Sequence, residues 1–113
     1  MTYLRRTLEP VIEKASEHFK VVMLSGLRQV GKSTLLKMIA GENRRYITLD
    51  NTAQRLMANE DPSSFFEHNQ APAIVDEIQL APSLFRPLKE KVDEQNGKGQ
   101  YWLSGSQRLH LMH

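Results

Sequence analysis

Residues 26–33 have the residue types and the spacing of a phosphate-binding loop. They read Gly-Leu-Arg-Gln-Val-Gly-Lys-Ser, which matches the pattern G-x-x-x-x-G-K-[ST]. Glycines let the backbone fold closely around phosphates, so that consecutive N–H groups point toward the anion. The Lys32 ammonium can reach the β- and γ-phosphates, and the Ser33 hydroxyl can complete a Mg²⁺ coordination shell. The expected nucleotide-binding residues are Gly26, Arg28, Gln29, Val30, Gly31, Lys32, Ser33 and Thr34.

The flanking sequence suits such a loop. Residues 21–24, Val-Val-Met-Leu, form a short apolar run that is typical of a strand, and apolar residues recur at helical spacing over 35–40, before Gly41. The loop requires this order of strand, glycine turn and helix, and the helix offers its positive end to the phosphates. Arg28, inside the loop, either leans over the nucleotide or is solvated.

The rest of the chain alternates between strand and helix patterns. We expect an amphipathic helix from about Leu8 to Phe19, beginning near Leu8 so that Pro10 lies in its first turn. Further strands are expected at 46–49, 73–75 and 101–103, and further helices around 53–57, 63–66 and 84–92. Strands that alternate with helices imply an α/β fold, a P-loop-type parallel sheet of about four strands with helices on both faces.

Two carboxylates follow the third expected strand. Asp76 ends an apolar run, where a buried carboxylate is costly unless it is paired or faces a metal. Downstream of a phosphate loop, such an aspartate holds Mg²⁺ opposite the Ser33 hydroxyl. The alternative is a strand-terminal aspartate that caps the next turn. Glu77 can polarise a water molecule for in-line attack on the γ-phosphate. The sequence has no D-x-x-G here and no N-K-x-D further on, which favours ATP over GTP.

The fourth expected strand also ends in polar residues, Ser104, Ser106 and Gln107. A hydroxyl or amide there can orient the attacking water or sense the loss of the γ-phosphate; the alternative is an ordinary turn of small residues. Functional groups of parallel sheets gather beyond the carboxyl ends of the strands, so the three polar clusters are expected to form one site. The expected catalytic residues are Glu77, Lys32, Ser104 and Ser106, and the expected metal ligands are Ser33 and Asp76.

Length and composition bound the class of protein. The 113 residues suffice for one small domain, expected to span 1–113, and 40% hydrophobic and 25% charged residues are ordinary for a globular protein. A net charge of +2 does not by itself indicate a nucleic-acid partner. No apolar run approaches about 18 residues and no apolar leader is visible, so neither a membrane span nor a signal peptide is expected. The absence of cysteine is compatible with the cytoplasm, which is the expected location.

The motifs together carry a family resemblance. Residues 26–33, Asp-Glu-Ile-Gln at 76–79 and Leu-Ser-Gly-Ser-Gln at 103–107 resemble the prokaryotic AAA-type P-loop ATPases. The resemblance is strongest to the branch whose Walker A motif reads G-x-R-Q-V-G-K-[ST] and whose Walker B motif reads D-E-I-Q. It covers almost the whole chain.

This resemblance implies that ATP and Mg²⁺ bind, with Lys32 on the phosphates. It places Ser33 and Asp76 at the metal and makes Glu77 the catalytic carboxylate. It also implies that the strand before the phosphate loop lies beside the strand that ends at Ser104.

Members of the family are typically longer and carry a C-terminal domain. The chain is therefore expected to be the N-terminal part of a longer ATPase, ending before a fifth strand and before an arginine that acts across subunits. An open parallel edge invites pairing with another chain, so self-association is expected where the fifth strand is missing.

Two functions stay open at this point. The first is an ATP-hydrolysing switch or motor module, and the second is a nucleotide-binding regulatory module with negligible hydrolysis in isolation. A small-molecule kinase would need an arginine-bearing lid, which the sequence does not indicate.

Overall fold

A parallel β-sheet forms the centre of the fold. The computed structural model describes residues 2–24 and 32–105. In chain order the elements are α1 (Thr2–His18), β1 (Val21–Leu24), α2 (Lys32–Ala40), β2 (Arg45–Thr48), α3 (Thr52–Glu60), α4 (Pro62–His68), β3 (Ala73–Asp76), the 3₁₀ turns η1 (Ile78–Leu80) and η2 (Pro82–Leu84), α5 (Phe85–Asp93) and β4 (Tyr101–Ser104).

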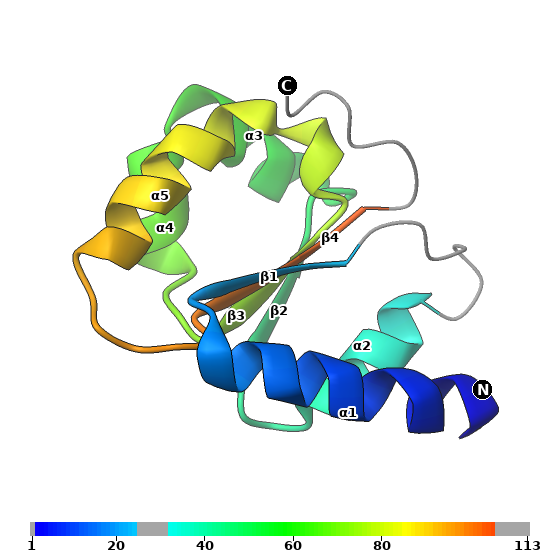
Figure 1. The fold of residues 1–113 in the computed structure, drawn as a ribbon. Helices are drawn as coiled ribbons and strands as arrows, with labels where there is room; N and C mark the ends of the chain where they lie inside the picture. Colours follow the sequence, from blue (N-terminus) through cyan, green and yellow to red (C-terminus); the bar gives the residue numbers. More distant parts are fainter. Residues whose placement is uncertain (1, 25–31, 106–113) are drawn as a thin grey trace.

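The strands lie in the order β1-β4-β3-β2, and all neighbours are parallel. Helices α1 and α2 cover one face of the sheet, and α3, α4 and α5 cover the other (Figure 1). This arrangement confirms the α/β fold expected from the alternating pattern. It also confirms that β1, the strand before the phosphate loop, pairs with β4.

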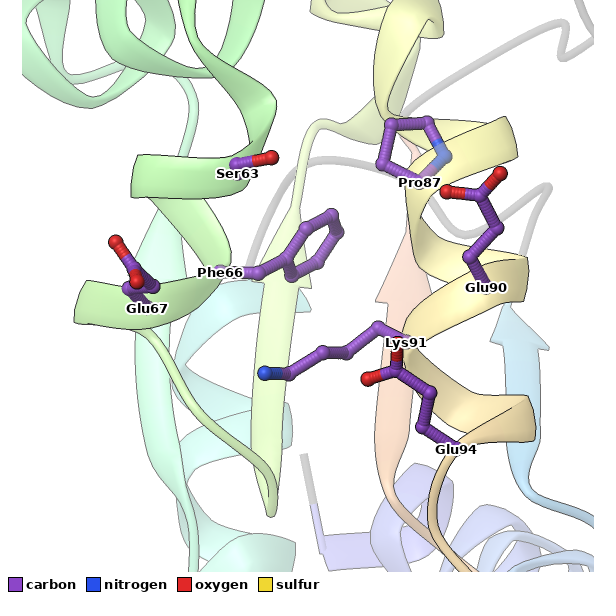
Figure 2. Close-up of a pocket in the computed structure, with 7 residues that line it drawn as sticks. All are labelled: Ser63, Phe66, Glu67, Pro87, Glu90, Lys91 and Glu94. Atoms are coloured by element: carbon purple, nitrogen blue, oxygen red, sulfur yellow. The ribbon is translucent and has the colours of Figure 1, made fainter.

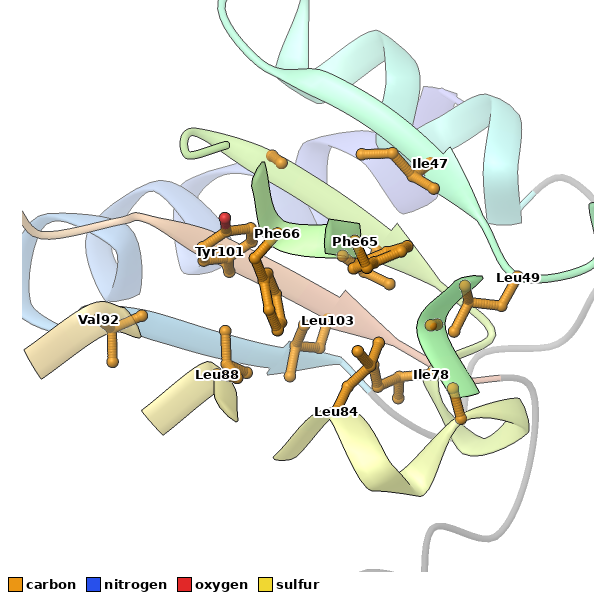
Figure 3. Close-up of a cluster of buried hydrophobic side chains, with 14 residues drawn as sticks. Ile47, Leu49, Phe65, Phe66, Ile78, Leu84, Leu88, Val92, Tyr101 and Leu103 are labelled. Atoms are coloured by element: carbon orange, nitrogen blue, oxygen red, sulfur yellow. The ribbon is translucent and has the colours of Figure 1, made fainter. Parts of the chain in front are cut away.

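Alternation along the central strands decides which side chains face which helices. On β4, Tyr101 and Leu103 belong to the core under α3, α4 and α5, whereas Trp102 belongs to the core under α1 and α2. On β3, Val75 and Ile74 divide in the same way. Figure 3 shows the larger of the two cores. Its buried members are Ile47, Leu49, Ala58, Phe65, Phe66, Ala73, Val75, Ile78, Ala81, Leu84, Leu88, Val92, Tyr101 and Leu103.

The first helix differs from the expectation at both of its ends. It begins at Thr2 and not near Leu8, so Pro10 lies in its interior. Pro10 is exposed, and water can therefore satisfy the carbonyl that the missing proline N–H leaves without a donor. The helix ends at His18, and Phe19, expected on the buried stripe, lies just beyond the last helical residue and is 62% exposed.

None of the helices in the described ranges is long and apolar enough to cross a membrane.

Two leucines provide a matched test of this packing. Leu84 is fully buried in the larger core, whereas Leu56 on α3 is 55% exposed. Leu84→Ala is expected to lower the free energy of unfolding by about 2–5 kcal/mol, because the truncation leaves a cavity. Leu56→Ala is expected to cost less than about 0.5 kcal/mol. Urea denaturation followed by circular dichroism measures both losses, and equal losses would contradict the packing.

Candidate nucleotide-binding site

Polar side chains from α2, β2, β3 and β4 meet at the carboxyl ends of β3 and β4. Asp76 is the last residue of β3, Ser104 is the last residue of β4, and Lys32 and Ser33 open α2. The alternation that sends Ile74 and Trp102 toward α1 and α2 sends Asp76 and Ser104 to the same face, two residues further on. The start of α2 lies on this face, so the sheet brings the separate sequence motifs together.

Asp76 lies at the centre of this cluster and is 1% exposed. Its Oδ1 accepts hydrogen bonds from Lys32 Nζ at 2.9 Å, from Ser104 Oγ at 2.6 Å and from the backbone N–H of Glu77 at 2.9 Å. A buried carboxylate needs such partners, because removing its charge from water is costly. One oxygen of Asp76 is thus held by three donors.

The other oxygen, Asp76 Oδ2, accepts two hydroxyl hydrogen bonds. Ser33 Oγ donates from α2 at 2.9 Å, and Tyr46 OH donates from β2 at 2.5 Å. Tyr46 reaches Asp76 because β2 pairs with β3 in parallel, with Tyr46 opposite Ile74 and therefore on the same face as Asp76. Donors from α2, β2 and β4 all converge on one carboxylate.

Lys32 joins the two carboxylates. Its Nζ lies 2.9 Å from Asp76 Oδ1 and 2.9 Å from Glu77 Oε2, and the residue is only 2% exposed. Counted over the described residues alone, two carboxylates and one ammonium give this buried group an excess of one negative charge. The group can therefore accept further positive charge.

Glu77 has an unusual backbone for a residue that is not glycine. Its φ and ψ are 59° and 45°, in the left-handed region, which such residues adopt at a cost of about 1–3 kcal/mol. This conformation turns the chain out of β3. The Glu77 carboxylate is held on both oxygens, by Lys32 on Oε2 and by Gln79 Nε2 on Oε1 at 2.8 Å.

These contacts set the charge states of the cluster. Burial alone raises the pKa of Asp76, but the hydrogen bonds from Ser104, Tyr46, Lys32 and Ser33 outweigh it and hold that pKa below its ordinary value. Burial lowers the pKa of Lys32, but its bonds and charge attraction to the two carboxylates raise it on balance. Asp76 is therefore ionised and Lys32 is protonated at neutral pH.

The structure brings together five of the residues expected in the site: Lys32, Ser33, Asp76, Glu77 and Ser104. Thr34 is exposed on α2, one residue beyond Ser33. The other expected residues lie outside the described ranges, namely Gly26, Arg28, Gln29, Val30, Gly31 and Ser106.

Two residues in this cluster were not expected from the sequence to be part of the site. In the sequence, Gln79 stands out only as part of the D-E-I-Q motif, and Tyr46 only as part of an expected strand. The alternation of side chains along β2 fixes the strand face on which Tyr46 lies. It predicts that Tyr46 belongs to the site only when β2 is known to pair with β3 in this register.

A separate pocket lies on the opposite face of the sheet, between α4 and α5. Figure 2 shows the Phe66 ring between the two helices. The pocket is lined by Ser63, Phe66, Glu67, Pro87, Glu90, Lys91 and Glu94, and none of these residues belongs to the polar cluster around Asp76.

The fold and the cluster define a class of protein, the α/β nucleotide-binding modules in which a lysine and a serine at a helix start face a strand-terminal carboxylate. A family model described as an AAA domain matches residues 18–113, and the chain belongs to this family. This finding confirms the resemblance to AAA-type P-loop ATPases. As an AAA domain, the chain is a nucleotide-binding, ATPase-like module. No curated protein and no solved structure matched the chain significantly.

The lowered pKa of Asp76 predicts a specific pH dependence of stability. A carboxylate whose pKa is lowered by folding stabilises the protein above its unfolded pKa of about 3.9, and this stabilisation is lost as the pH falls through the folded pKa. Asp76→Asn should therefore be less stable than the wild type at pH 7, and the difference should shrink below about pH 4. Urea unfolding over a pH series measures this.

Asp93→Asn, at the exposed end of α5, is the matched control for that series and should leave the shape of the profile unchanged. An Asp76→Asn curve parallel to that of the wild type down to pH 2 would contradict the charge state assigned to Asp76.

Proposed function

We propose that this module binds ATP together with Mg²⁺ and hydrolyses it, acting as a switch or motor element of a larger machine. The observation that carries the proposal is the convergence of Lys32, Ser33 and Ser104 on the Asp76–Glu77 pair at the ends of two adjacent strands. Ligands of parallel α/β sheets bind at this edge. Membership of the AAA domain family also supports nucleotide binding.

Lys32 is the residue proposed to hold the phosphates. In the structure its ammonium lies between the carboxylates of Asp76 and Glu77. A triphosphate offers it stronger charge-assisted partners, so Lys32 exchanges its carboxylate contacts for contacts to the β- and γ-phosphates. Residues 26–31 lie outside the described ranges, but their sequence matches that of a loop type whose backbone N–H groups enclose phosphates.

The residues present fit Mg²⁺. Ser33 Oγ and Asp76 Oδ2 are hard oxygen donors that lie 2.9 Å apart, and the Lys32 ammonium contacts the other oxygen of Asp76, Oδ1. Within the described ranges, no group of three His, Cys, Asp or Glu side chains could hold a metal ion by itself. This matches Mg²⁺, which commonly uses one or two protein ligands together with substrate phosphates and water. When bound, the ion neutralises charge on the phosphate oxygens.

Glu77 and Ser104 are proposed to act on the attacking water. Glu77 accepts the proton of that water as it approaches the γ-phosphate, and Ser104 is placed to orient the water or to sense the departure of the phosphate. Glu77 can do so only after Lys32 has left it, because Lys32 and Gln79 occupy both of its oxygens in the structure. Phosphate binding by Lys32 thereby releases the base.

The same contacts support a second candidate, a regulatory nucleotide-binding module with negligible hydrolysis in isolation. In that case Glu77 stays bonded to Gln79, and nucleotide binding alone carries the signal. A single-turnover assay of phosphate release, with protein in excess over ATP, separates the two functions.

Glu77→Gln tests the role of the carboxylate. The amide keeps the size of the side chain but cannot accept a proton, so ATP affinity should be preserved while single-turnover hydrolysis slows about 10²–10⁴-fold. Calorimetry and phosphate release measure the two effects. Glu67→Gln, a matched change on the opposite face of the sheet, should alter neither. Equal hydrolysis rates for Glu77→Gln and wild type would remove Glu77 from the mechanism.

Lys32→Ala tests phosphate binding. Loss of a charge-assisted contact should weaken ATP binding about 10–100-fold in calorimetric titrations. Lys89→Ala, an exposed lysine on α5, should bind ATP like the wild type. Circular dichroism shows whether each variant is folded. Undiminished ATP uptake by a folded Lys32→Ala protein would refute the proposed function.

A further inference from the structure

Tyr46 contacts the proposed metal ligand Asp76 from the neighbouring strand β2. It lies on β2, on the strand face toward α1 and α2, and its hydroxyl is 2.5 Å from Asp76 Oδ2. This is the same oxygen that accepts the Ser33 hydroxyl at 2.9 Å. A side chain with no expected role in the site therefore bonds directly to the proposed metal ligand.

The direction of this hydrogen bond follows from the groups that meet at Asp76. The Tyr46 phenol has a proton to donate, and the carboxylate already accepts from Ser33 on the same oxygen and from Lys32 and Ser104 on the other. Tyr46 is thus the donor, and it donates to a charged acceptor, which makes the bond strong.

The Tyr46 ring is held independently of its hydroxyl. It packs against the core under α1 and α2, and the Lys37 ammonium lies 4.6 Å from the ring centroid. These contacts involve only the ring, and a phenylalanine would keep them. The hydroxyl can therefore be removed with little change to the packing.

The two strands that flank β3 each hold one oxygen of Asp76. Tyr46 on β2 donates to Oδ2, and Ser104 on β4 donates to Oδ1. With a donor on either side, the carboxylate cannot rotate about its terminal bond without breaking one of the two bonds. The Ser33 hydroxyl, at the start of α2, donates to the same oxygen, so the bond from Tyr46 keeps Oδ2 next to Ser33.

We propose that Tyr46 is a positioning residue for Mg²⁺: its hydroxyl fixes the Asp76 carboxylate next to Ser33, in the orientation that the metal–nucleotide complex requires. The inference rests on the proposed function. Groups that orient metal ligands typically change metal affinity by about 10- to 100-fold when they are removed.

Tyr101 provides the matched control. Tyr101 is fully buried, whereas Tyr46 is partly buried, and the Tyr101 hydroxyl donates a hydrogen bond at 2.8 Å to the backbone carbonyl of Asn69, on the side of the opposite core. Tyr101→Phe and Tyr46→Phe each remove one hydroxyl from a tyrosine ring that packs in a core. Only Tyr46→Phe removes a bond to Asp76.

The test is a Mg²⁺ titration of ADP binding, measured by calorimetry at fixed protein and nucleotide concentrations. For Tyr46→Phe, the Mg²⁺ concentration at half-effect should rise at least about 10-fold, while ADP affinity in EDTA stays that of the wild type. Tyr101→Phe should lower stability and leave the Mg²⁺ dependence unchanged. Ser104→Ala, which removes the other anchor of Asp76, should shift the Mg²⁺ dependence in the same direction as Tyr46→Phe.

The outcomes separate this inference from the proposed function. A wild-type protein that binds ADP with a Mg²⁺ dependence that Tyr46→Phe leaves unaltered would overturn the role of Tyr46 alone. A parallel loss of ADP affinity in EDTA would also overturn it, because the hydroxyl would then act on the nucleotide or on folding rather than on the metal. A wild-type protein that binds no nucleotide would overturn the proposed function and this inference with it.

Discussion

The ionised carboxylate of Asp76, buried at the end of a central strand, is the constraint on which the rest of the site depends. Removing such a charge from water costs several kilocalories per mole unless donors surround it. Here the donors come from α2, β2 and β4 and from the next peptide group of the chain itself. Strand order, register and the position of α2 must all be correct before the charge is satisfied. The hydrogen bonds to Asp76 therefore also help to specify this arrangement of the strands and α2.

The charge balance of the cluster explains why a nucleotide and a divalent ion belong together in the proposed function. Lys32 keeps the carboxylates of Asp76 and Glu77 from repelling each other. Under the proposed function, phosphates that drew Lys32 away would face the two neighbouring carboxylates. Binding phosphate alone would then be opposed by like charge, and a divalent cation held by Ser33 and Asp76 would reduce this repulsion.

Much of the fold and site could be predicted from the sequence because local patterns carried the signal. Apolar runs that end in polar residues located Asp76 and Ser104 at strand ends, and the spacing of the loop located Lys32 and Ser33. Tyr46 could not be found in this way. Its role depends on the pairing of β2 with β3 and on the register of that pair, which are properties of tertiary structure. The expectation that Pro10 lies in the first turn of its helix is wrong for a related reason. A local rule cannot show that Pro10 is exposed, where water can take the place of the missing donor.

Glu77 shows how chemistry and conformation compete at one position. Its left-handed backbone suits glycine best, and no turn rule would select a glutamate there. The strain is offset on both sides: the Glu77 N–H bonds to Asp76 Oδ1, and Ile78, the next residue, is buried in the larger core. The Leu80 N–H bonds to the Glu77 carbonyl and closes the turn. A glycine would relax the backbone but remove the carboxylate that faces Lys32. The contact of its carboxylate with Lys32 therefore explains the glutamate at this position. The surrounding hydrogen bonds stabilise a backbone conformation that glutamate rarely adopts.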